Sequence, residues 1–134
     1  MLLHLLKSKL HMAAVTETEL HYHGSVTIDR ELMDAVGLLP YEKVLIANCE
    51  NGQRAESYVI EGPPGSKVIK MNGALAHTSS IGDRVIIIAF VSVTEEESRK
   101  HDPRVAILNE QNEIIDQFIG EVYPQRDSQT QPLS

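Results

Sequence analysis

The chain has 134 residues, a formal net charge of −7 and a single cysteine. The length suits one domain with one core, and the acidic balance, with no tryptophan, argues against binding to nucleic acid or anionic lipid. One cysteine, Cys49, cannot form an internal disulfide, which fits a reducing compartment. The longest apolar run, 85–91, is too short to cross a bilayer, and the N-terminal leucines lack the flanking features of a signal peptide. We therefore expect a cytoplasmic protein that does not enter the membrane.

Short β-branched and apolar stretches separated by turn signals predict a mainly β protein. The expected strands cover residues 7–16, 25–28, 44–47, 54–60, 67–71, 84–93, 105–108 and 114–119. In the first strand, alternation predicts that Leu10, Met12 and Ala14 share one side and Lys9, His11 and Ala13 the other. For the leucines before residue 7, the sequence also allows a turn of helix.

A few short helices are expected between the strands. Asp29 can cap a helix over residues 30–36, which Gly37 would end. Its buried stripe would be Leu32, Met33 and Val36. Asn72 is expected to cap one or two helical turns over residues 73–77, and a capping box of Thr94 and Glu97 predicts a helix over residues 94–100.

The spacing of these elements suggests a compact β-barrel in one domain. Asn51-Gly52 carries the signal of a hairpin between the strands over 44–47 and 54–60. The chain shows no repeat and no domain boundary, and we expect residues 123–134 to form a flexible tail.

The sequence around Gly24-Ser25 allows two interpretations. A Gly-Ser pair between extended segments is most simply a turn. Alternatively, Ser25 Oγ attacks the Gly24 carbonyl and the amide becomes an ester. β-Elimination of this ester and hydrolysis with loss of ammonia would leave a pyruvoyl group. Such a ketone condenses with an amino acid and acts as an electron sink.

Other chemistries are disfavoured by residue spacing. The six histidines come without a cysteine pair or an H-E-x-x-H motif, so no metal site is expected. The loop over residues 62–67 lacks the spacing of a phosphate-binding loop. Ser25 does not lie in a G-x-S-x-G elbow, which leaves an ordinary serine hydrolase unsupported.

Five groups of residues have the order and spacing of the aspartate 1-decarboxylase family, which the chain resembles from residue 1 to about residue 113. They are Lys9-Leu10-His11, Leu20-His21-Tyr22 before Gly24-Ser25, Asn51-Gly52 with Arg54, Tyr58, and Asn72-Gly73-Ala74 with Ala76-His77. These pyruvoyl-dependent enzymes make β-alanine for pantothenate, the precursor of coenzyme A. The resemblance implies a double-psi β-barrel with short helices and a homotetramer with active sites between subunits. It also implies self-cleavage into residues 1–24, the β chain, and residues 25–134, the α chain.

The resemblance further implies a role for each site residue. Ser25 would become the covalent pyruvoyl group, with neither metal nor pyridoxal phosphate, and Tyr58 would be the proton donor. The residues expected to bind L-aspartate are Lys9, Arg54, Ser57, Gly73, Ala74 and Leu75. Those expected to support the site and the cut are His11, Tyr22 and Asn72. Ser57 matches a position where threonine is usual and Leu75 one where alanine is usual, which suggests altered cleavage and a narrower pocket.

Elementary electrostatics supports this assignment. Arg54 offers the planar fork that binds a carboxylate through two hydrogen bonds. Local cations such as Lys9 are needed because both the protein and the substrate are negatively charged. Two further interpretations stay open: an N-terminal-nucleophile hydrolase in which Ser25 keeps its amine, and a non-enzymatic β-barrel interaction module.

Overall fold

The computed structural model describes residues 1–120, so the tail predicted over residues 123–134 lies outside the described part. The strands within it are β1 (Leu2–Ala14), β2 (Glu17–Glu19), β3 (Ser25–Asp29), β4 (Lys43–Asn48), β5 (Arg54–Gly62), β6 (Ile69–Asn72), β7 (Arg84–Thr94), β8 (Arg104–Leu108) and β9 (Ile114–Ile119). They form one mixed sheet in the order β2-β6-β3-β5-β4-β7-β1-β8-β9. The prediction of a mainly β protein is confirmed.

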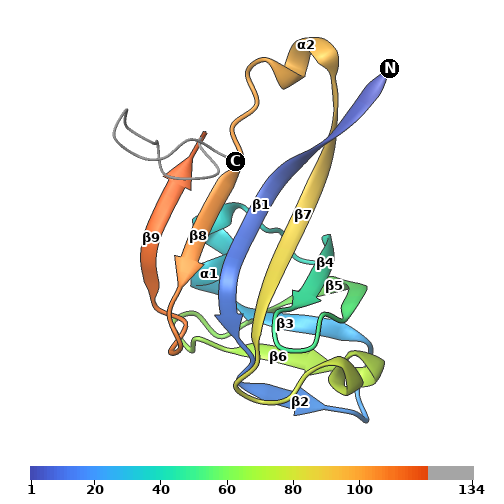
Figure 1. Ribbon diagram of the computed structural model, residues 1–134, viewed down its shortest axis with the longest axis vertical. Coiled ribbons are helices and arrows are strands. Elements are labelled where there is room, and N and C mark those ends of the chain that lie inside the picture. Colours follow the sequence, from blue (N-terminus) through green and yellow to red (C-terminus); the bar gives the residue numbers. More distant parts are fainter. Residues whose placement is uncertain (121–134) are drawn as a thin grey trace.

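One bent segment closes the sheet into a barrel. β1 pairs with β7, and after Val15 and Thr16 the chain continues as β2, which pairs with β6. At the bend, Thr16 N donates to the Ile69 carbonyl at 2.8 Å, and Ile69 N donates to Thr16 Oγ1 at 2.9 Å. In Figure 1, β1 and β7 run side by side along the molecule, and β2, β3 and β6 cross below them.

The barrel interior holds the hydrophobic core. The strand residues in it, each at most 3% exposed, include Leu10, Val26, Ile28, Val44, Ile46, Val59, Ile69, Met71, Val85 and Ile87. Neighbours of these residues in each strand face outward, because successive side chains in a strand alternate between faces. The outer face of β6, β3 and β5 therefore belongs to a different set of residues, and these form the site described below.

β1 departs from the predicted strand in two ways. It begins at Leu2, so the alternative of a helical turn at the N-terminal leucines is wrong. Register shifts between Leu6 and Ser8 and between Leu10 and Ala13, with Met12 at φ 64°, interrupt the alternation. Ala13 is therefore fully buried next to a buried Ala14, although strict alternation predicted opposite sides.

The helices are α1 (Arg30–Val36), the 3₁₀ helix η1 (Gly73–Thr78) and α2 (Glu95–Ser98). α1 buries Leu32, Met33 and Val36 as predicted and ends at Gly37, which has φ 77°. Both bonds of the predicted capping box are present at α2. No helix within residues 1–120 has the length and apolar character needed to span a bilayer.

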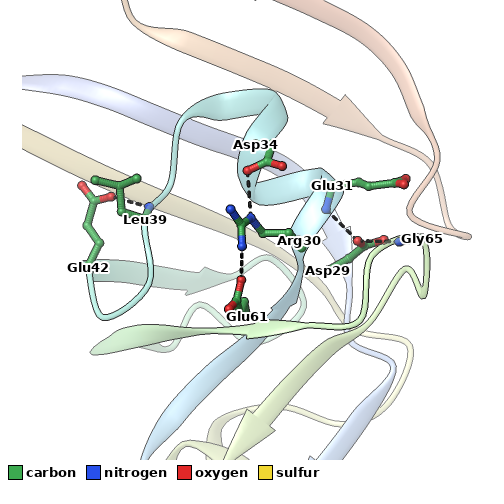
Figure 2. Close-up of polar contacts among 8 residues, drawn as sticks. All are labelled: Asp29, Arg30, Glu31, Asp34, Leu39, Glu42, Glu61 and Gly65. Atoms are coloured by element: carbon green, nitrogen blue, oxygen red, sulfur yellow. Dashed lines mark hydrogen bonds and ion pairs between the residues drawn. The ribbon is translucent and has the colours of Figure 1, made fainter.

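Asp29 connects β3, α1 and the loop before β6. Its Oδ1 accepts hydrogen bonds from Glu31 N at 2.8 Å and Gly65 N at 2.9 Å, and its Oδ2 accepts one from Lys67 N at 2.8 Å. Figure 2 shows Asp29 between the helix start and Gly65, while the neighbouring Arg30 pairs with Asp34 and Glu61. One buried carboxylate thus satisfies three backbone donors.

We expect Asp29→Ala to lower the free energy of unfolding by about 3 kcal/mol, because three backbone N–H groups lose a charged acceptor. Urea unfolding followed by circular dichroism at fixed protein concentration measures this. The control is Asp34→Ala, which removes an exposed carboxylate from the same helix and is expected to change stability little. Equal losses for the two variants would contradict the role given to Asp29.

Candidate active site

Ser25 is the first residue of β3, which lies between β6 and β5 (Figure 1). β3 is antiparallel to β6 and parallel to β5, and the register places Ser25 opposite Asn72. Ser25 is fully buried, whereas residues 20–24 are all exposed. The bond between Gly24 and Ser25 therefore joins an exposed segment to the first residue of a strand that is paired on both sides.

Asn72 holds the Ser25 hydroxyl. Asn72 Nδ2 donates to Ser25 Oγ at 2.9 Å and to Thr27 Oγ1 at 3.0 Å. The Ser25 hydroxyl in turn donates to the His23 carbonyl at 3.2 Å. Asn72 Oδ1 is buried and has no hydrogen-bond partner within residues 1–120. This acceptor is available to a donor group that enters the site.

The predicted capping role of Asn72 is wrong. η1 begins at Gly73 as expected, but the Asn72 side chain makes no capping hydrogen bond. The backbone of Asn72 is extended, with φ −108° and ψ 145°, so its side chain stands on the outer face of β6 and reaches toward β3. Asn72 Nδ2 binds Ser25, while Oδ1, the atom that would accept a capping hydrogen bond, has no partner within residues 1–120.

Gly73 brings the start of η1 against the segment before Ser25. It has φ +66°, and a Cβ at this position would lie 2.8 Å from the Tyr22 carbonyl oxygen and 2.9 Å from Gly24 Cα and N. A side chain cannot occupy that space without moving backbone, so only glycine permits the approach. Gly24 itself has open space where its own Cβ would be.

β5 carries both predicted hydroxyls, but Ser57 and Tyr58 are successive residues and point to opposite faces of the strand. The parallel pairing of β3 with β5 begins at Val26 and Val59, and the same register carried one residue back sets Tyr58 alongside Ser25. The Tyr58 ring is tilted against that of Tyr41, with 6.5 Å between centroids. Ser57 shares its side of the strand with the buried Val59.

The predicted cations are more distant. Arg54 is exposed at the start of β5, about 13 Å from Tyr58 along an extended strand. Lys9 lies in β1 opposite Ile88 of β7 and Val105 of β8, and three strands separate β1 from β3 in the sheet order. The substrate-binding roles assigned to Lys9 and Arg54 stay predictions.

His11 and Leu75 have surroundings that the sequence did not indicate. Burial, together with the charges of Lys9 and Arg84, lowers the pKa of His11 and so favours its neutral ring. Its Nδ1 is buried without a partner among the described residues. Leu75 is 6% exposed and packs into the core, whereas Ala74 is exposed at the start of η1. The substrate contacts assigned to Ala74 and Leu75 stay predictions.

Two neighbours of the site escaped the sequence reasoning. Thr27 shares the Asn72 amide with Ser25, and Lys70 lies opposite Thr27 with its Nζ 5.6 Å from the centroid of the Tyr22 ring. Each is two residues from a predicted site residue in the same strand. Period-two alternation could therefore have placed both on the face of Ser25 and Asn72.

The groups around Ser25 suit an acyl shift from nitrogen to oxygen. The nucleophilic Oγ is held by an amide from a neighbouring strand, and the carbonyl that it would attack belongs to an exposed glycine. Within residues 1–120, no cluster of three or more histidine, cysteine, aspartate or glutamate side chains is arranged to hold a metal ion.

Comparison with known proteins identifies close relatives. A family model described as aspartate decarboxylase matches residues 1–115, a range that contains every predicted site residue. The aspartate 1-decarboxylase of Hyphomonas neptunium is 53% identical over 114 residues, which are 85% of this chain and 97% of that protein. The aspartate 1-decarboxylase of Bacillus subtilis is 51% identical over 116 residues, 87% of this chain and 91% of that protein.

We expect Gly73→Ala to stop or strongly slow cleavage between Gly24 and Ser25, because the new methyl group would displace the segment that carries the bond. Separation of the denatured chains on a gel measures the cut fraction. The control is Gly82→Ala, where φ is also positive, at +94°, but no atom lies within 4 Å of the added Cβ. Comparable cleavage in both variants would show that the close approach of Gly73 is unimportant.

Proposed function

The chain belongs to the aspartate decarboxylase family, and we propose that it cuts itself between Gly24 and Ser25 and then converts L-aspartate into β-alanine and CO₂. The product would feed pantothenate and coenzyme A biosynthesis, in the reducing cytoplasm that the single cysteine suits. The observation that carries the proposal is Ser25, buried at the start of β3 and hydrogen bonded to Asn72, directly after an exposed glycine.

Self-cleavage would use only groups of the chain and water. Ser25 Oγ forms a bond to the Gly24 carbonyl carbon as the carbon–nitrogen bond breaks, and the hydroxyl proton passes to the freed amine. Loss of the Ser25 α-proton then breaks the bond between Cβ and Oγ, which releases residues 1–24 with a carboxylate end. Addition of water to the remaining unsaturated residue and departure of ammonia leave the ketone of a pyruvoyl group.

The residues around Ser25 fit such a group. Asn72 offers a buried donor, Nδ2, within hydrogen-bond distance of the Ser25 side chain, and an unpartnered acceptor, Oδ1. When formed, the ketone supplies a sink for the electrons that the departing carboxylate leaves behind. The backbone N–H groups of Gly73 and Ala74 at the start of η1 are candidates to bind a substrate carboxylate.

Tyr58 is the proton donor in this proposal. The register of β3 and β5 supports the role, since it sets Tyr58 alongside Ser25 on the same face. Ser57 would hold the Gly24 carbonyl through its hydroxyl, in the place where the family usually has threonine. Serine rotates more freely than threonine, which predicts a slower cut than with threonine at this position.

The cations support an assembly of several chains. The substrate is an anion and the chain has a net charge of −7, so positive side chains must act close to the substrate. Lys9 is separated from Ser25 by three strands within one chain. We propose a homotetramer in which Lys9 and Arg54 reach the site across a subunit boundary.

The mass of the denatured protein tests the proposal. We expect two chains, residues 1–24 and 25–134, with the larger one lighter by one ammonia than a peptide that begins with serine. Retained ammonia would instead indicate an N-terminal-nucleophile hydrolase. A single uncut chain that releases no CO₂ from L-aspartate would leave the interaction module as the better interpretation.

Ser25→Ala is expected to give a folded chain that is neither cut nor active, since the nucleophile and the source of the ketone are removed together. Release of CO₂ from carboxyl-labelled L-aspartate measures the activity. The control Ser98→Ala removes a hydroxyl from α2, far from β3 (Figure 1), and is expected to be cut normally. Production of β-alanine by the Ser25→Ala protein would falsify the pyruvoyl mechanism.

A further inference from the structure

Lys70 lies on the outer face of β6, two residues before Asn72. It is paired with Thr27 of β3 on one side and with Glu17 of β2 on the other. Its neighbours in the strand, Ile69 and Met71, are fully buried in the core, so its side chain points outward. Lys70 therefore shares a face with Ser25 and Asn72, and nothing in the proposed cut or decarboxylation uses it.

The ammonium of Lys70 has three neighbours. Lys70 Nζ lies 3.2 Å from Glu19 Oε1, 3.8 Å from Glu17 Oε2, and 5.6 Å from the centroid of the Tyr22 ring. The Lys70 side chain is 24% exposed, so the ammonium is partly shielded from water. An ammonium at this distance from an aromatic ring is attracted to the negative face of the ring. The two carboxylates restrain the ammonium on the side of β2.

Residues 20–24 have few other attachments, one of which is the hydrogen bond that Ser25 Oγ donates to the His23 carbonyl. Outside the helices and strands, no backbone–backbone hydrogen bond within residues 1–120 involves them. Gly73 closely approaches Tyr22 and Gly24, but it contributes no side chain that could hold them. The contact between Lys70 and the Tyr22 ring is thus a side-chain attachment of this segment, two residues before Gly24.

We propose that Lys70 is a positioning residue for self-cleavage: with Glu17 and Glu19 it holds the Tyr22 ring, and so keeps residues 20–24 seated on Gly73 with the Gly24 carbonyl near Ser25. This inference rests on the proposed self-cleavage. Lys70 touches neither reacting atom, so its effect is on the population of chains in which the bond and the hydroxyl are correctly placed. That effect ends once the bond is cut.

The test compares cleavage rates of freshly made protein. Chains are labelled during cell-free synthesis, synthesis is stopped, and the fraction of labelled chains that has been cut is followed over time on a denaturing gel. Lys70→Met keeps most of the stem and removes the charge, and it is expected to slow the cut about two- to fivefold, the range of a partly exposed cation–π contact. Lys70→Arg keeps a cation that stacks on aromatic rings and is expected to restore most of the rate.

Changes at Tyr22 separate the ring contact from the ion pairs. Tyr22→Leu leaves Glu17 and Glu19 paired with Lys70 and is expected to slow the cut as Lys70→Met does. Tyr22→Phe keeps the ring and is expected to cut faster than Tyr22→Leu. The double variant Lys70→Met/Tyr22→Leu should be no slower than the slower single variant, because both remove one contact. If the double variant were instead slowed by the product of the two single-variant factors, the proposal would be overturned.

Two controls make the outcome specific. Lys100→Met removes an exposed lysine after α2 and should cut at the rate of the unaltered chain. Fully cut Lys70→Met protein is also assayed for CO₂ release, and a kcat lowered by the same factor as the cut would indicate general distortion and contradict a positioning role. If the unaltered chain is never cut, the proposed function fails. If it is cut and Lys70→Met is cut equally fast, this inference alone fails.

Discussion

The site depends on β3 being paired on both sides, with β6 from Ser25 onward and with β5 from Val26 onward. Ser25 is opposite Asn72 of β6, and the parallel register with β5, which begins at Val26 and Val59, sets Tyr58 alongside Ser25 when it is carried one residue back. Residues 20–24 are exposed, so the change from exposed segment to buried strand occurs at the bond between Gly24 and Ser25. A group formed from Ser25 would stay within the sheet after the cut, because among the described strands β3 pairs only with β5 and β6. Both of these strands follow Ser25 in the chain, and residues 1–24 reach this part of the sheet through β2, which pairs with β6.

Two adjacent residues, Asn72 and Gly73, contribute to the site in opposite ways. Asn72 acts through its side chain, which binds Ser25 Oγ and leaves one buried oxygen without a partner. Gly73 acts through the lack of a side chain, which lets backbone approach Tyr22 and Gly24. The unpaired acceptor is a cost to the folded state, and such costs are typical of sites that must bind or release another group.

The barrel separates the two kinds of group that the reaction needs. The hydroxyl and amide groups gather on β3, β5 and β6, whereas Lys9 belongs to β1 on a distant part of the sheet. An acidic chain that acts on an anion requires local positive charge. Lys9 and the groups around Ser25 thus belong to different parts of the sheet order, which supports the assembly of several chains proposed above.

Local sequence determined much of this protein by itself. The ends of α1, the capping box of α2 and most strands follow from interactions within a few residues, and the order of the family motifs indicated the chemistry. Tertiary structure decided what depends on which strands become neighbours. Bulges around Met12 buried Ala13, β2 formed from Glu17-Thr18-Glu19 without any apolar pattern, and Asn72 bound Ser25 instead of capping η1. Alternation could place Thr27 on the face of Ser25 and Lys70 on the face of Asn72, but only the pairing of β3 with β6 sets Thr27 opposite Lys70.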